Sequence, residues 1–172
     1  ELSLNTRLVT GDPTDAQSPH QTLGTTFDKW DSNWDRLHLT YAPKAVDGLT
    51  LWLGKYAHPF HKNRVYGELV FDDDVGAEGL AARYAVKGGE NSILDKFELT
   101  LGGYDFIESN ALDDTFVFVA QAAGTFKLAE SWSATGAVGY YLWGGPVVGS
   151  NAVLTGDNSG NATVDLTGDG IA

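Results

Sequence analysis

Five charged or ionisable side chains lie on the polar side of segments in which polar and apolar residues alternate. Guanidinium groups attract anions, and a nearby carboxylate competes with those anions for the guanidinium groups. If the polar sides of these segments line a water-filled lumen, the same residues form its wall. We therefore predict that the lining residues are Arg7, Arg36, His38, Arg83 and Glu98. The alternative interpretation is that the arginines only pair with Glu98 or with other strand carboxylates.

A run of three aspartates, Asp72, Asp73 and Asp74, lies in a long polar connection. If this connection folds into the lumen, its carboxylates face the arginines on the opposite wall, and the opposed charges create a transverse electric field. We therefore predict that this connection is a constriction loop. The net charge of −12 favours cations, whereas the strand-borne arginines favour anions. Salt screens charges over about 8 Å, so the aspartates affect passing ions only if the loop folds into the lumen. For an inward-folded loop we predict weak cation selectivity. The alternative is a solvated loop, which is the commoner role of a charge run.

Two further clusters have the residue types of a metal site, but neither has a strong signature. His58 and His61 precede the aspartate run without the spacing of a known metal motif. Asp165, Thr167 and Asp169 resemble the first half of a calcium loop, with oxygen ligands at alternate positions. A polar Asp-Gly turn explains this second pattern more simply. We therefore predict no bound metal and no cofactor, with the calcium loop as the weaker alternative.

Few enzymatic routes are compatible with the sequence. The chain has no Cys, and it lacks the nucleophile elbow, the Walker loop and the glycine motif of dinucleotide sites. The one route left is a hydrolase that pairs His38 with a serine on a neighbouring strand, and no specific serine is marked. A net charge of −12 repels phosphate backbones, so nucleic acid is not expected as a partner. We predict that the protein is not an enzyme.

Alternation with a period of two residues recurs along the chain, whereas helical periodicity is hard to find. The connections between the alternating segments are short and long in turn, which is typical of an up-and-down antiparallel barrel. The sequence therefore predicts an all-β antiparallel meander, either a transmembrane β-barrel or a fragment of one. The orientation of the sixth segment stays open because both of its sides are apolar. The predicted strands cover residues 2–8, 34–42, 49–54, 79–87, 97–102, 115–126 and 132–143.

The two sides of these strands predict which surface would contact lipid. No apolar run reaches the roughly 20 residues of a transmembrane helix, and among strand structures only closed barrels pair every backbone group in hydrocarbon. A soluble β-domain with one packed face gives the same alternation and stays the alternative. The predicted outer face carries Leu37, Leu39, Leu49, Leu51, Leu53, Leu80, Tyr84, Leu99 and Leu101. Aromatic belts at the membrane interfaces are predicted from Trp34, Tyr41, Tyr56, Tyr104, Trp132 and Trp143.

Several motifs within residues 1–86 resemble, in order and spacing, those of the bacterial family of putative porins. They are Gln21-Thr22-Leu23-Gly24, Trp34-Asp35-Arg36-Leu37, Tyr41-Ala42-Pro43, Gly48-Leu49-Thr50-Leu51, Gly54-Lys55, His58-Pro59-Phe60, Phe71-Asp72-Asp73-Asp74 and Gly79-Leu80-Ala81. The resemblance implies an outer-membrane β-barrel for passive diffusion of small polar solutes or ions. Its partners would be the lipid bilayer, lipopolysaccharide and the solutes. One departure is His58, where the family pattern leads us to expect Asn.

The chain is expected to form a single β-barrel domain over residues 1–172, with a loop or tail rich in Gly, Asn and Thr at 144–172. Bacterial single-chain barrels have an even number of strands, so seven strands lead us to expect a fragment whose edges are paired or covered. Three functions stay open: a diffusion pore, a structural outer-membrane barrel without an open pore, and a soluble β-sheet module that binds a ligand. A homo-oligomer is compatible with each.

Overall fold

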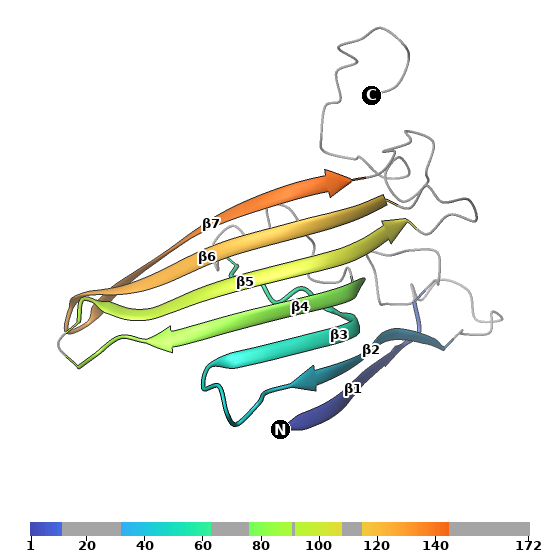
Figure 1. Cartoon of the computed structure of the whole chain (residues 1–172), viewed down its shortest axis with the longest axis horizontal. Coiled ribbons are helices and arrows are strands. Elements are labelled where there is room, and N and C mark those ends of the chain that lie inside the picture. Colours follow the sequence, from blue (N-terminus) through green and yellow to red (C-terminus); the bar gives the residue numbers. More distant parts are fainter. Residues whose placement is uncertain (12–31, 63–75, 91, 108–114, 145–172) are drawn as a thin grey trace, which may run out of the picture.

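The described part of the chain folds into one sheet of seven antiparallel strands. The computed structural model describes residues 1–11, 32–62, 76–90, 92–107 and 115–144. Each strand pairs with its neighbour in sequence, as Figure 1 shows, so the predicted all-β antiparallel meander is confirmed. The strands are β1 (Leu2–Val9), β2 (Asn33–Tyr41), β3 (Leu49–Ala57), β4 (Gly76–Lys87), β5 (Leu94–Ile107), β6 (Thr115–Ala129) and β7 (Trp132–Gly144).

Within the described residues the sheet is open, with β1 and β7 at its edges, and barrel closure is not seen. Strands β2, β4 and β6 end, and β3, β5 and β7 begin, on the left of Figure 1. Strand β5 is longer than predicted because the alternation continues through Tyr104, which is buried, and Asp105, which is exposed. No helix in these parts of the chain is long and apolar enough to cross a membrane.

The strand register places all the predicted outer-face residues on one side of the sheet. Directly paired residues project to the same side, and one such row runs from Leu39 through Leu53 to Leu80. A second row runs from Leu49 through Tyr84 to Leu99. This side, here called the outer face, is exposed: Leu53 and Leu80 are each 56% accessible. Leu4 on β1 and Phe118 on β6 extend it across the sheet.

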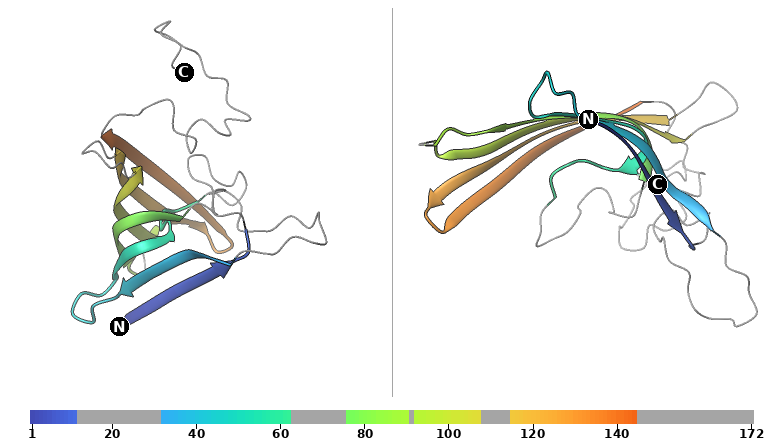
Figure 2. Two further views of the ribbon diagram at one scale, coloured as in Figure 1. Left: turned by 90° about the vertical axis from the view of Figure 1, so that its right-hand side faces the viewer. Right: turned by 90° about the horizontal axis from the view of Figure 1, so that it is seen from below.

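The opposite side, here called the inner face, carries the buried core. Figure 2 shows that the sheet is curved, and the core residues belong to this face or pack on it: Tyr56, Phe60, Ala81, Tyr104, Val117 and Val119. The prediction of a membrane belt is therefore wrong for two residues, since Tyr56 is 1% and Tyr104 3% exposed. Three other residues of the predicted belts, Trp34, Tyr41 and Trp132, are exposed, and their place in a belt stays a prediction. The side chain of Trp143 lies outside the described part.

Gly54, on the inner face of β3, has a conformation that other residues rarely adopt. Its φ is 114°, and it pairs directly with His38 of β2. A Cβ at this position would lie 2.5 Å from the backbone oxygen of Leu37. The close approach of β2 and β3 thus depends on the missing side chain.

Candidate pore-lining site

All five predicted lining residues lie on the inner face. Arg7 pairs with Arg36, and His38 pairs with Asn5, in the register of β1 and β2. Arg83 pairs with Thr100, and Ala85 pairs with Glu98, in the register of β4 and β5. The alternation that predicted a shared side for these residues therefore holds across the sheet. Their exposure to a water-filled lumen stays a prediction.

The first charged cluster lies where β1 and β2 approach the long connection between them. The register shifts between Arg7 and Leu8, so Asp35 is an extra residue on β2 beside Arg36. The guanidinium Nε of Arg7 donates to Oδ2 of Asp35, and Nε of Arg36 lies 3.4 Å from the same oxygen. Asp35 is only 15% exposed. One carboxylate thus lies between two guanidinium groups, which leaves the cluster of Arg7, Asp35 and Arg36 with one net positive charge.

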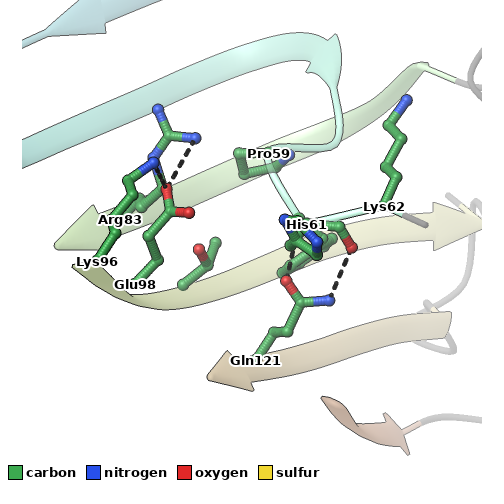
Figure 3. A pocket seen from close by; sticks show the side chains of 9 residues that line it. Pro59, His61, Lys62, Arg83, Lys96, Glu98 and Gln121 are labelled. Atoms are coloured by element: carbon green, nitrogen blue, oxygen red, sulfur yellow. Dashed lines mark hydrogen bonds and ion pairs between the residues drawn. The ribbon is translucent and has the colours of Figure 1, made fainter. Parts of the chain in front are cut away.

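The second charged cluster has the same ratio of cations to carboxylates. On β5, Nζ of Lys96 lies 2.9 Å from Oε1 of Glu98. Nη1 of Arg83 approaches that oxygen from β4 at 3.8 Å. The guanidinium of Arg83 also lies over the ring of Trp52, 5.1 Å from its centre. Figure 3 shows Arg83, Lys96 and Glu98 side by side, and this cluster too carries one net positive charge.

The two clusters lie at different depths along the strands. Leu37, next to Arg36, pairs with Lys55, and Lys55 pairs with Glu78. Arg83 is five residues farther along β4 than Glu78. At about 3.3 Å per residue, the clusters are separated by roughly 15–20 Å along the strand direction. A solute moving along the inner face would meet them in succession.

Between the two clusters, the segment after β3 lies against the inner face. Phe60 is 6% exposed and packs against Tyr104, with their ring centres 6.2 Å apart. His61 then bonds to Gln121 of β6: its backbone N–H donates to Oε1 at 2.6 Å, and its carbonyl accepts from Nε2 at 3.2 Å. The segment 58–62 therefore crosses from β3 to β6 over β4 and β5. Figure 3 shows its contact with β6, where His61 meets Gln121. His38 contacts Tyr56 beside this segment, with ring centres 5.8 Å apart.

A pocket of about 390 Å³ remains between this segment and the sheet. One wall is formed by the segment itself, the other by the second charged cluster and its neighbours on β5 and β6 (Figure 3). Thr100, which also lines the pocket, is 2% exposed. The pocket is lined by Pro59, Phe60, His61, Lys62, Arg83, Lys96, Glu98, Thr100 and Gln121.

The predicted constriction residues Asp72, Asp73 and Asp74 lie outside the described residues, as do the calcium candidates Asp165, Thr167 and Asp169. Strands β3 and β4 flank the connection that contains the aspartates, and its first residues do lie on the inner face. His58 stacks on Phe60 with ring centres 5.8 Å apart. In the described ranges, no three His, Asp or Glu side chains gather as a metal site would require.

Sequence reasoning missed four residues that organise the inner face: Asp35, Phe60, Lys96 and Gln121. Lys96 had a usable signal, because it lies two residues before Glu98 and so shares its side of the strand. Gln121 had a weaker one, as a polar residue in an apolar segment. Asp35 depends on a shift in register, and Phe60 on the path of a connection. Neither of these leaves a periodic pattern.

The chain was compared with known protein families, curated proteins and solved structures. The family model described as "Putative porin" matches residues 1–161. No curated protein and no solved structure matches the chain significantly.

Proposed function

Given that the chain belongs to the family of putative porins, we propose that it forms the wall of an outer-membrane pore for passive diffusion of small polar solutes and ions. In this proposal the outer face contacts lipid and, in the outer leaflet, lipopolysaccharide. The inner face contacts water and the passing solute. The two charged clusters and the segment 58–62 then lie in the path of diffusion.

The observation that carries this proposal is the inverted polarity of the sheet. A soluble sheet covers its apolar side with a second layer, because exposed apolar area costs about 25 cal/mol per Å². Here the apolar side is the uncovered one among the described residues: Leu101 is 49% and Val138 78% exposed. The ion pairs of the two charged clusters lie on the opposite side, where Asp35 and Glu98 are each 15% exposed. A membrane barrel has this arrangement, with apolar residues outward and polar residues towards the lumen.

The segment 58–62 supports a narrow passage. It is fixed to the inner face by the burial of Phe60 and by the two bonds between His61 and Gln121. Such a segment reduces the cross-section without filling the pocket beside Arg83. The same observation makes a structural barrel without an open pore the second candidate, since a segment that crosses the lumen can also close it.

Solute permeation into liposomes separates these candidates. Protein reconstituted into liposomes is exposed to sugars of increasing size, and the rate of swelling is followed by light scattering. We expect swelling that falls steeply with the size of the sugar, because segment 58–62 narrows the path. Inserted protein without swelling would support the structural barrel. A monomer that stays soluble without detergent would instead support a β-sheet module that binds a ligand.

A further inference from the structure

We propose that the pocket between segment 58–62 and strands β4 to β6 is a binding subsite for small organic carboxylates. Its role on a diffusion path rests on the proposed pore, whereas binding itself can be measured without conductance. Three features favour such a ligand: the charge balance of the second cluster, the contacts that hold Arg83 and the shape of the pocket.

The charge balance of the pocket wall favours an anion. Glu98 accepts from Lys96 at 2.9 Å, while Arg83 is 3.8 Å from the same oxygen. Within the described residues Glu98 is the carboxylate at the pocket, so Arg83 and Lys96 share one negative charge, and Lys62 is a third cationic residue of the lining. A small anion entering the pocket would neutralise the remaining positive charge. A cation would have to displace Lys96 or Arg83 from Glu98 first.

Arg83 is held beside the pocket by a contact that leaves its donors available. Its guanidinium Cζ lies over the ring of Trp52, 5.1 Å from the ring centre, and this cation–π contact restricts the movement of the group. The side chain is 35% exposed. Its longer contact with Glu98 leaves guanidinium N–H donors for a ligand, and such a planar fork matches the two oxygens of a carboxylate. Lys96, 44% exposed, supplies a second positive group on the adjacent strand.

The shape of the pocket sets the size and character of the rest of the ligand. A volume of about 390 Å³ lies within the roughly 300–1,000 Å³ of small-molecule sites. Opposite the charged wall, Pro59 and Phe60 offer an apolar surface. A ligand with one carboxylate and a short apolar or hydroxylated body fits both walls. Inorganic phosphate would use the charges but not the apolar side.

The test is a binding titration of the protein in detergent micelles. Saturation-transfer NMR follows the methyl signals of propionate, with propionamide as its uncharged counterpart. We expect saturable binding of propionate and none of propionamide at the same concentration. Arg83→Gln should weaken propionate binding about tenfold or more, since it removes a charge-assisted contact. Should this variant fail to fold, Lys96→Gln carries the same expectation.

The direction in which Glu98→Gln changes the affinity for propionate is the decisive result. It removes the carboxylate that competes for Arg83 and Lys96, so propionate should bind several-fold more tightly. A purely structural effect would weaken binding in this variant as well. Lys44→Gln is the matched control, because it removes one positive charge from an exposed turn outside the pocket, and it should leave binding unchanged.

Three results would overturn the subsite: equal binding of propionate and propionamide, weaker binding in Glu98→Gln, or displacement of propionate by inorganic phosphate at a lower concentration. The outcome is independent of the pore. Saturable propionate binding by a protein without conductance would uphold the subsite and contradict the proposed function.

Discussion

Gln121 of β6 holds the backbone of His61 by two hydrogen bonds, although the two residues are 60 positions apart in sequence. The side-chain amide accepts from the N–H of His61 and donates to its carbonyl, as a neighbouring strand would. The segment after β3 is therefore fixed across the inner face at β6. In the proposed pore, the width of the passage therefore depends on this side chain, together with the buried Phe60.

Replacing Gln121 with Ala should widen the passage. Two hydrogen bonds, each with a net value of about 1 kcal/mol, then no longer hold segment 58–62. We expect a larger unitary conductance and more current noise in planar bilayers. Thr125→Ala, on the same face of β6 but bonded to Thr135, is the control and should behave as the unmodified protein does. An unchanged conductance and noise in Gln121→Ala would show that the segment does not limit the passage.

The assignment of faces is tested by two neighbouring residues of β7. Val138 lies on the outer face opposite Ala122, and Ala137 lies on the inner face opposite Ala123. Because both are in the middle of the strand, an arginine at either position has nearly the same depth. Val138→Arg should lower the free energy of unfolding by about 2–4 kcal/mol, and Ala137→Arg by much less. Urea unfolding from lipid vesicles measures both, and the reverse order would favour a soluble core on the apolar side.

The contact between β2 and β3 is tested at Gly54. Its φ of 114° disfavours alanine, and the Leu37 oxygen, 2.5 Å from where a Cβ would lie, leaves no room for a methyl group. We expect Gly54→Ala to lower the free energy of unfolding by about 1–3 kcal/mol. Gly136→Ala in β7 is the matched control, since a Cβ there has nothing within 4 Å. Equal stability of the two variants would mean that β2 and β3 can separate without cost.

Ion selectivity is tested at the aspartate run. If the connection containing Asp72, Asp73 and Asp74 continues along the inner face as residues 58–62 do, its carboxylates oppose the positive charge of the two clusters. Changing all three residues to Asn should then shift the reversal potential in a KCl gradient towards anions, and more strongly at low salt. A reversal potential that does not move would place the aspartates away from the passage.

The sequence predicted the meander and its faces because both follow from a period of two residues. The row of Leu39, Leu53 and Leu80 shows this directly. The orientation of β6 stayed open because Phe118 on one side and Val119 on the other are both apolar. Only the structure shows that Val119 packs in the inner cluster, while Phe118 is 55% exposed.

Two tyrosines show that residue type and strand-end position do not distinguish an aromatic residue of a membrane belt from one of the core. Tyr56 and Tyr104 have the residue type and strand-end position of belt aromatics, yet their inner positions and the burial of Phe60 against Tyr104 place them in the core. That packing depends on the path of the chain after β3. A connection that folds back onto a sheet leaves no periodic pattern in the sequence, so the two hydrogen bonds between His61 and Gln121 were not predictable.

The conductance of the purified protein in a planar lipid bilayer tests the proposed pore most directly. We predict discrete current steps that grow with the KCl concentration, because in the proposed pore the inner face lines a water-filled path. Insertion is checked independently by co-flotation with lipid vesicles. Protein that floats with the vesicles and gives no current steps would contradict the pore.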